Sequence, residues 1–364
     1  MPRINDKPLL TFAIAALNQE RFISEAVEAA FAQTYSPLEI ILSDDHSEDR
    51  TFEIMKEMAA AYRGPHKIIL NQNPARRCIG GHINRIIEIS SGELIVGAAG
   101  DDVSLPKRAH VTYEAWEKSG RRATSIYSNF TQIDESGSPI QQRYKTVPNV
   151  HEELVEQKTT SWQYVRTLQP VVFGCAHSFS RELFRSFGSL PESLIHEDNV
   201  LGFRSVLAGE IHYINQPLVK YRLHGNNIYL SGNRRGVDLQ TLQRQEERLG
   251  SYFRNKENMY GALLLDLDKP IATRLLSAQD LEKTRAETIR MQKCFSSMGR
   301  FLESGFVSRC RIFLQVRRSG LVPTEIRGLA KRLVPRPLFL RIRLALAYVA
   351  ALRRPDMLLL TPGL

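Results

Sequence analysis

Short apolar runs alternate with segments of helical periodicity over the first 135 residues. Each run is nearly continuous in aliphatic residues, as in a strand buried on both faces of a parallel sheet. We expect such strands at 9–17, 38–42, 66–70, 93–99 and 124–133. Between them, apolar residues recur at helical spacing after Asn18 and over 49–62, 78–90 and 106–119. This alternation predicts an open α/β sheet with right-handed crossovers.

The pattern changes after residue 140. Residues 140–160 are polar and are expected to form an exposed loop. Beyond them we expect a strand at 171–179, helices at 181–187 and 196–208, and two extended pieces within 211–224 that are broken at Pro217. Strand signals end near Gly236, and 237–317 is helical apart from a break at 268–270. We therefore expect two domains, an α/β domain over 1–235 and a helical region over 236–364.

Lys and Arg exceed Asp and Glu by ten (49 − 39), and the excess is concentrated near the end of the chain. Between Glu325 and Asp356 the sequence holds eight basic residues and no acidic one. The remainder is close to neutral, which argues against a nucleic-acid-binding protein. Segment 331–354 is apolar as well as basic and suits an anionic membrane surface. Packing or dimerisation through an apolar helix face explains the same pattern, and both interpretations stay open.

Cysteine usage and the absence of targeting signals bear on localisation. The four cysteines, Cys78, Cys175, Cys294 and Cys310, show neither zinc-site spacing nor a dense disulfide framework. The first residues lack the apolar core of a signal peptide, and no run of 18 uncharged apolar residues occurs. We expect a cytoplasmic protein, free or attached peripherally to the inner face of the membrane.

Three acidic pairs are the candidates for chemistry. The motifs GxGxxG, GxxxxGK[ST] and GxSxG do not occur in the sequence, which disfavours a Rossmann dehydrogenase, a P-loop NTPase and an α/β-hydrolase. Asp44-Asp45 and Asp101-Asp102 each follow an apolar strand, where α/β sheets bind ligands. Glu197-Asp198 opens a predicted helix.

Each pair has a ligand-binding and a structural interpretation. Asp44-Asp45 suits an N–H of a heterocycle such as uracil N3, but Asp is also an ordinary helix cap. The like charges of Asp101-Asp102 suit Mg²⁺ or Mn²⁺, or cap the following helix. Glu197-Asp198 supplies a general base or complements the helix dipole. Arg222 and His224, which end an extended segment, suit a pyrophosphate and a metal, although a lone His is more often structural.

Four segments in a fixed order are more specific than any one of them alone. They are Asn18–Thr51 with Gln33-Thr34-Tyr35 and DDHSEDRT, then GELIVGAAGDDVSLPKR at 92–108, HEDNVLGFR at 196–204 and YRLHGNN at 221–227. In this order, over about residues 9–230, they resemble glycosyltransferase family 2. The resemblance implies a GT-A fold, a Rossmann-like α/β architecture. It also implies inverting transfer of a hexose-like sugar from a nucleotide-diphospho-sugar, with UDP favoured.

The resemblance also implies roles for individual residues. Asp198 would be the catalytic base with Glu197 beside it, and Asp101 and His224 would hold Mg²⁺ or Mn²⁺. The remaining predicted site residues would contact the nucleotide or the donor sugar: Ala16, Asn18, Asp44, Asp45, Asn84, Asp102 and Arg222. The expected partners are a nucleotide-sugar donor and a glycan or lipid-linked acceptor in surface-polysaccharide or glycolipid assembly, without nucleic acid. A homo-oligomer is left open.

Two positions depart from the family pattern. Ala99 stands where the family has the first Asp of its metal motif, which leaves a catalytically inactive nucleotide-sugar-binding or scaffold protein as an alternative. The retained Asp101 counts against that alternative, because Mg²⁺ often takes only one or two protein carboxylates. His46 stands where Gly is usual. A nucleotidyltransferase is a third interpretation, disfavoured because 16–22 contains no glycine-rich loop.

Overall fold

The computed structural model describes residues 7–140, 152–225, 227 and 239–317. Contacts divide the chain into two compact units, residues 1–230 with 261–288 and residues 231–260 with 289–364. The domain boundary expected at residue 235 stays a prediction, and the contacts add 261–288 to the first unit. The basic segment 331–354 lies outside the described residues.

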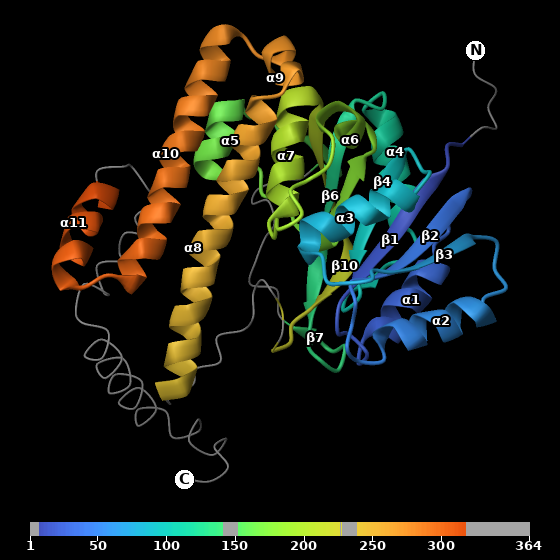
Figure 1. The fold of residues 1–364 in the computed structure, drawn as a ribbon. Helices are drawn as coiled ribbons and strands as arrows, with labels where there is room; N and C mark the ends of the chain where they lie inside the picture. Colours follow the sequence, from blue (N-terminus) through green and yellow to red (C-terminus); the bar gives the residue numbers. More distant parts are fainter. Residues whose placement is uncertain (1–6, 141–151, 226, 228–238, 318–364) are drawn as a thin grey trace. The chain divides into compact units, whose positions relative to one another are not determined.

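Ten strands of the described chain form one sheet in the first unit (Figure 1). Along the sheet the order is β3-β2-β1-β4-β9-β6-β10-β5, with β7 paired to β6 and β8 paired to β10. The strands are β1 (Leu10–Ala16), β2 (Leu38–Asp44), β3 (Lys67–Gln72), β4 (Leu94–Ala99), β5 (Val103–Ser104), β6 (Ala123–Ile133), β7 (Pro139–Ile140), β8 (Leu154–Glu156), β9 (His177–Ser180) and β10 (Glu210–Arg222).

The parallel strands β1, β2, β3 and β4 bring their carboxyl ends to one edge of the sheet. Ala16 lies opposite Asp44 in the β1–β2 pair, and Ala15 lies opposite Ala99 in the β1–β4 pair. Strand β9 runs antiparallel between β4 and β6. The polar residues after β2 and β4 therefore emerge on either side of the end of β1, which is where an α/β sheet binds its ligand.

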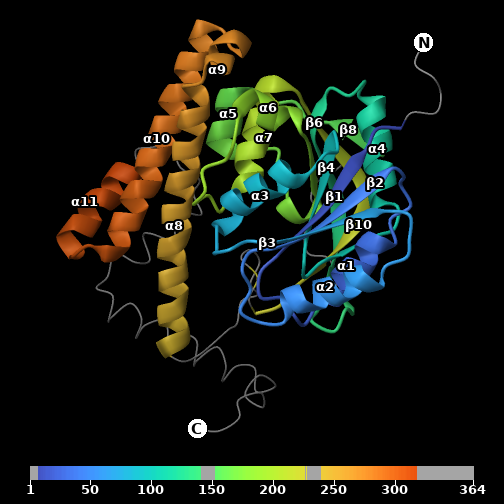
Figure 2. The same cartoon turned by 45° about the vertical axis from the view of Figure 1, so that its right-hand side comes forward.

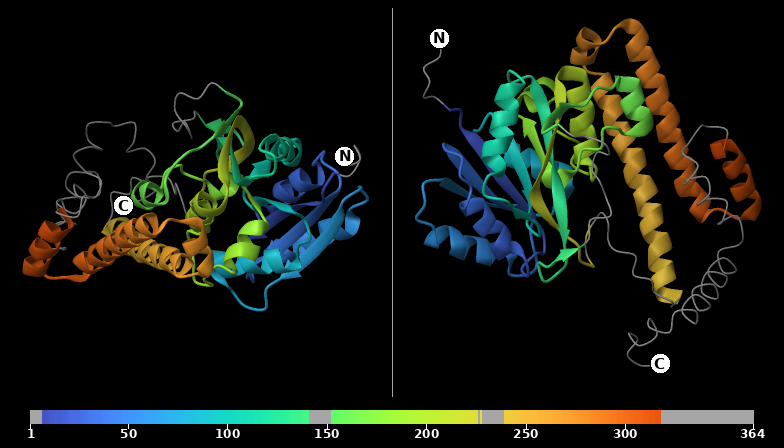
Figure 3. Two further views of the ribbon diagram at one scale, coloured as in Figure 1. Left: turned by 90° about the horizontal axis from the view of Figure 1, so that it is seen from above. Right: turned by 180° about the vertical axis from the view of Figure 1, so that it is seen from behind.

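Helices cover both faces of this sheet (Figures 1 and 3). The even-numbered residues of β1 pack into a core with α1 (Ile23–Phe31), α2 (Thr51–Ala61) and α4 (Arg108–Lys118). The opposite face contacts α3 (Cys78–Ile89) through β1 and α7 (Glu197–Ala208) through β6 and β10. Smaller elements of this unit are α5 (Ser161–Thr167), the 3-10 helix η1 (Gly174–Ala176), α6 (Glu182–Phe187) and α9 (Pro270–Leu275).

Three sequence predictions in the middle of the chain were wrong in detail. The segment expected as two pieces is one strand, β10 (Glu210–Arg222), because a bulge with register shifts on both sides of Pro217 keeps it paired to β6. The strand expected at 171–179 is confined to His177–Ser180, since the preceding residues form η1. The loop at 140–160 contains β8, which pairs with β10.

The helical region expected over 237–317 is confirmed over its described part, 239–317, with α8 (Leu239–Leu267), α10 (Ala278–Glu303) and α11 (Phe306–Arg317) (Figure 2). In the second unit, aromatic rings of α8 pack on Phe295 of α10, with Tyr260 stacked at 5.6 Å. In the first unit, the buried Asp266 of α8 pairs with Arg204 of α7 at 2.7 Å. Among the described residues, none of the helices is both long enough and apolar enough to cross a membrane.

Candidate active site

The carboxylates of Asp44 and Asp45 lie at the end of β2 and hold the loop that follows. Asp44 accepts hydrogen bonds from the Ser47 hydroxyl, from the Ser47 N–H at 2.9 Å and from the Gln72 amide at 3.3 Å. Asp45 Oδ1 accepts from the Asn73 amide at 2.8 Å and from the Arg77 N–H at 3.0 Å. Both interpretations of this pair therefore stay open, but Asp44 has the fuller structural role.

The segment after β1 packs against the same loop. Ala16 O accepts the Asp45 N–H at 2.9 Å. Asn18 Oδ1 accepts the Glu48 N–H at 2.8 Å, and the Asn18 N–H donates to Ser47 Oγ at 2.8 Å. Ala16, Asn18, Asp44 and Asp45, all predicted to contact the nucleotide, are thus brought together at one edge of the sheet.

The backbone explains why glycine suits position 46. His46 has φ +65°, in the left-handed region that glycine adopts without a Cβ penalty. The histidine is accommodated there with its Nδ1 3.2 Å from Asn73 O. The departure at His46 therefore leaves the turn intact.

Asp101 and His224 meet although they are far apart in the sequence. His224 Nε2 lies 2.9 Å from Asp101 Oδ2, and both side chains are largely buried. Asn227 holds the turn that carries His224: its Oδ1 accepts the His224 N–H at 2.5 Å, and its amide donates to Arg222 O at 2.9 Å. Phe22 packs against the His224 ring at 5.0 Å between centroids.

Arg222 lies beneath the Asp101-Asp102 turn and is fully buried. Its backbone N–H donates to Asp102 Oδ1 at 2.8 Å, and its Nε donates to Asp101 O at 3.0 Å. The rest of the guanidinium donates to Glu135 O at 3.2 Å and to Glu25 Oε2 at 2.9 Å. These contacts make Arg222 a residue that positions the turn, and its predicted contact with the nucleotide stays untested.

Asp102 has an unusual electrostatic environment. Burial, followed by the charge of Asp101, raises the pKa of Asp102 well above its usual range. The hydrogen bond from the Arg222 N–H and the positive charges of Arg108 and Arg222 act in the opposite direction and lower this pKa. Arg108 is itself buried, bonded to Ser104 Oγ at 2.8 Å and to Gly97 O at 2.5 Å, and burial lowers its pKa to about 10. At neutral pH Arg108 thus keeps its positive charge below the turn.

Glu197 and Asp198 occupy the first turn of α7. Asp198 Oδ1 accepts hydrogen bonds from the Asn199 N–H at 2.7 Å and from the Asn199 amide at 2.8 Å. Burial, and then the neighbouring Asp198, raises the pKa of Glu197 well above its usual range. Gly174 faces this pair, since a Cβ built there would lie 2.9 Å from Glu197 Oε1. A side chain at 174 would displace Glu197.

Cys175 connects the two acidic pairs electrostatically. Burial raises the pKa of its thiol, and the charges of Asp102, Asp101 and Asp198 raise it further against that of Arg108. The charges of Asp101 and Asp102 after β4 and of Asp198 in α7 therefore all act on the Cys175 thiol. Sequence reasoning did not identify Arg108 or Phe22, and the only signal for Arg108 was its place at the end of the matched segment 92–108.

Asn84 lies apart from the other predicted nucleotide contacts. Its amide donates to Leu190 O at 2.8 Å, and its Oδ1 accepts the Leu190 N–H at 2.8 Å. Both ends of the side chain are thus bonded to the backbone of the segment that precedes α7. The nucleotide contact predicted for Asn84 stays untested.

Asp101 and His224 fit a divalent cation that is shared with a substrate. In the described part of the chain, no group of three or more His, Cys, Asp or Glu side chains is arranged to hold a metal ion. Mg²⁺ and similar cations are commonly held by one or two protein ligands together with phosphate oxygens and water. Asp101 supplies such a carboxylate, and the His224 imidazole beside it would be a second ligand if a bound substrate supplied the phosphate oxygens.

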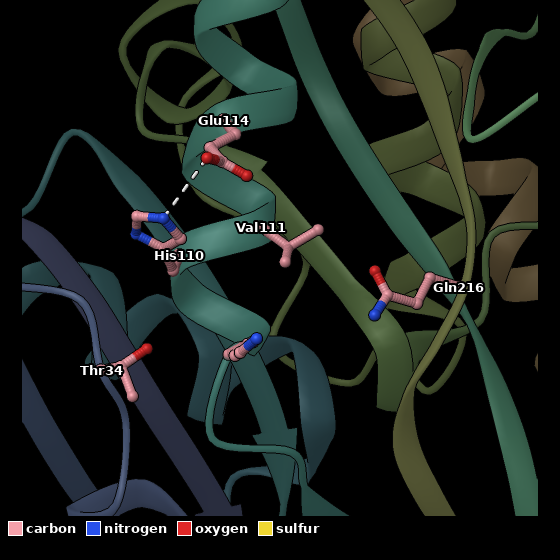
Figure 4. Close-up of a pocket in the computed structure, with 6 residues that line it drawn as sticks. Thr34, His110, Val111, Glu114 and Gln216 are labelled. Carbon is pink, nitrogen blue, oxygen red and sulfur yellow. Dashed lines mark ion pairs between the residues drawn. The ribbon is translucent and has the colours of Figure 1, made fainter.

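A separate surface pocket of about 590 Å³ lies near the start of α4 (Figure 4). Its lining residues are Thr34, Lys107, His110, Val111, Glu114 and Gln216. His110 and Glu114 form an ion pair at 3.3 Å on the surface of α4. None of the predicted site residues lines this pocket, so we assign it no part in the chemistry.

The sheet and the helices on its two faces have the GT-A architecture, an α/β fold. Residues 11–188 match the family model described as glycosyl transferase family 2, in agreement with the resemblance that the sequence motifs indicate. The architecture expected from the sequence is thereby confirmed.

Curated relatives and solved structures agree with this assignment. The chain is 31% identical over 134 residues to the putative glycosyltransferase EpsE of Bacillus subtilis, covering 37% of this chain and 47% of that protein. It is 25% identical over 218 residues to an uncharacterized glycosyltransferase of Rickettsia felis, covering 60% of this chain and 34% of that protein. The chain thus spans between a third and a half of the length of these relatives. A crystal structure of S. aureus TarS 1–349 in complex with UDP-GlcNAc has the same fold, with TM-score 0.56, 15% identity and coverage of 95% and 92% of the two chains.

Proposed function

We propose that the protein is an inverting glycosyltransferase that moves a hexose-like sugar from a nucleotide-diphospho-sugar to a hydroxyl group. The observation that carries the proposal is the Asp101–His224 pair beyond β4, with His224 Nε2 2.9 Å from Asp101 Oδ2. A UDP-sugar is the favoured donor, and the TarS structure with UDP-GlcNAc supports that choice.

In this proposal the nucleoside lies at the end of β1 and β2, near Asn18 and Asp45. The diphosphate lies against the turn of Asp101 and Asp102. Mg²⁺ or Mn²⁺ bound by Asp101 and His224 would neutralise charge on the leaving diphosphate. Arg222 bonds this turn directly, and Arg108 bonds Gly97 and Ser104 on either side of it, so the carboxylates are oriented before substrate binds.

Asp198 acts as the general base. It accepts the proton of the acceptor hydroxyl while the hydroxyl oxygen bonds to the anomeric carbon from the face opposite the diphosphate. The bond from that carbon to the diphosphate breaks, and its electron pair leaves with the nucleoside diphosphate. Configuration at the carbon is therefore inverted. Asn199 orients the base through Asp198 Oδ1, and Glu197, whose pKa is raised by burial, lies beside it.

The acceptor is proposed to be a glycan or lipid-linked hydroxyl of a surface polysaccharide or glycolipid. We also propose that the protein acts in the cytoplasm at the inner face of a membrane, which it contacts through residues 331–354. A homo-oligomer is part of the same proposal. One alternative is an inactive nucleotide-sugar-binding or scaffold protein. Ala99 favours it, because the end of β4 lacks the carboxylate that an Asp at position 99 would supply.

A donor-hydrolysis and transfer screen tests the proposed activity. Purified protein is incubated with UDP-, GDP- and dTDP-sugars and hydroxyl acceptors in Mn²⁺, and release of the nucleoside diphosphate is measured. We expect release from one nucleotide class and loss of transfer in Asp198→Asn. Binding of a nucleotide-sugar without turnover on any acceptor supports the inactive alternative instead.

A further inference from the structure

Helix α3 contacts both ends of the proposed site through different residues. Its first turn faces the segment that leads into α7, and its middle faces the polar end of β2. The two sets of contacts use side chains and backbone groups that the mechanism does not otherwise employ.

The first contact is an exchange of hydrogen bonds with the segment 190–194. No side chain caps the start of α3, whose first N–H groups would otherwise lack acceptors. Leu194 O accepts the Gly80 N–H at 2.8 Å, and Glu192 O accepts the Gly81 N–H at 3.2 Å. The fit is close, because a Cβ at Gly80 would lie 2.2 Å from Pro191 O.

Asn84 completes this contact one helical turn later. Its amide and carbonyl bond the Leu190 backbone in both directions, each at 2.8 Å. The segment is therefore held at both ends by α3, at Leu190 and at Leu194. The proposed base Asp198 follows only four residues after Leu194. A displacement of the held segment would therefore move the Asp198 carboxylate.

The second contact is a buried polar network toward Asp45. His82 Nε2 lies 2.7 Å from Ser43 Oγ, the residue before Asp44. Asn71 donates to Ser43 Oγ at 3.0 Å and to Asn73 Oδ1 at 3.1 Å, and Asn73 donates to Asp45 Oδ1 at 2.8 Å. Arg85 Nε donates to Asn71 Oδ1 at 3.0 Å, which gives α3 a second attachment to this network.

We propose that α3 sets the distance between the donor end of the site and its base, with Asn84 and His82 as positioning residues that act at opposite ends. Asn84 acts through the segment 190–194 on Asp198, and His82 acts through Ser43 on Asp45. The inference rests on the proposed function. Its physical basis is that transfer requires reacting atoms within about 3–3.5 Å, so a shift of about 1 Å costs on the order of 100-fold in rate.

The test separates the two ends by kinetics. Asn84→Ala is expected to lower kcat by about 10- to 100-fold while the donor KM stays within about twofold. His82→Gln is expected to raise the donor KM with little loss of kcat. Asn84→Asp keeps the acceptor for the Leu190 N–H and should recover part of the rate. Glu57→Ala, at an exposed position of α2, serves as the control.

A second readout is independent of activity. Amide hydrogen exchange, followed by mass spectrometry, should become faster over 188–198 in Asn84→Ala and stay unchanged there in Glu57→Ala. If the wild type shows no transfer with any donor but this exchange pattern is found, the proposed function fails and the positioning contact stands. A raised donor KM at unchanged kcat in Asn84→Ala, or unaltered exchange over 188–198, overturns the inference.

Discussion

His224 Nε2 lies 2.9 Å from Asp101 Oδ2, although 123 residues separate them in the sequence. Asp101 follows β4 and His224 follows β10 of the same sheet. Asn227 holds the turn that carries His224, and Arg222 holds the turn that carries Asp101. If this pair binds the cation, His224→Ala should weaken Mn²⁺-dependent nucleotide binding by at least about 10-fold. Isothermal titration measures this affinity, with the exposed Glu57→Gln as control. Equal Mn²⁺ dependence in His224→Ala and wild type would remove His224 from the site.

The role of Asp198 as base predicts a loss confined to turnover. Asp198→Asn keeps the size of the side chain and an oxygen for the Asn199 N–H, but it cannot take up a proton. We expect kcat to fall by about 10² or more with unchanged donor affinity. Single-turnover transfer and equilibrium donor binding are the two measurements. Normal transfer by this variant contradicts the assignment.

The shifted pKa of Glu197 predicts how stability depends on pH. The folded protein retains this proton at pH values above about 4.5 where the unfolded chain has lost it. Since the native state then binds more protons, this group makes the free energy of unfolding fall as pH rises through that range. Glu197→Gln should therefore be more stable than wild type at pH 7–8, with the gain vanishing near pH 4. Thermal unfolding across pH checks this, and a gain independent of pH would contradict it.

The Arg204–Asp266 pair predicts a large cost from deleting one partner. Both side chains are essentially unexposed, and Arg204 contacts both oxygens of Asp266, at 2.7 and 3.1 Å. Arg204→Ala should lower the free energy of unfolding by about 3 kcal/mol, the low end for a broken buried pair, because Lys269 remains 2.6 Å from Asp266. Urea denaturation measures the change. The double variant with Asp266→Ala should lose less than the sum of the two single variants.

The left-handed backbone at His46 predicts opposite effects of two substitutions. His46→Gly relieves a conformational cost of about 1–2 kcal/mol but loses the contact with Asn73 O, so we expect a net gain of up to about 1 kcal/mol. A β-branched side chain in His46→Val should be destabilising. Denaturation midpoints of both variants test this. A destabilised glycine variant would show that the histidine contact dominates.

The fold could be predicted largely because its signals are local. The signals for β1, β2 and β4 and for the helices between them each lie in one continuous stretch of sequence. The predicted break at Pro217 was wrong because a bulge accommodates the proline within β10. The roles of Arg222 and Asn84 could not be predicted in the same way. Whether Arg222 reaches a phosphate or the Asp101 carbonyl depends on a residue 121 positions away, which no local pattern encodes.

The central claim is that this edge of the sheet binds a nucleotide together with a divalent cation. Calorimetric titration of UDP, GDP and dTDP, each with and without Mn²⁺, tests it most directly, with Asp101→Ala measured in parallel. The account predicts binding of one nucleotide, UDP in the first instance, that requires Mn²⁺ and is lost in Asp101→Ala. Binding that is indifferent to both Mn²⁺ and Asp101, or no binding of any of the three, would contradict it.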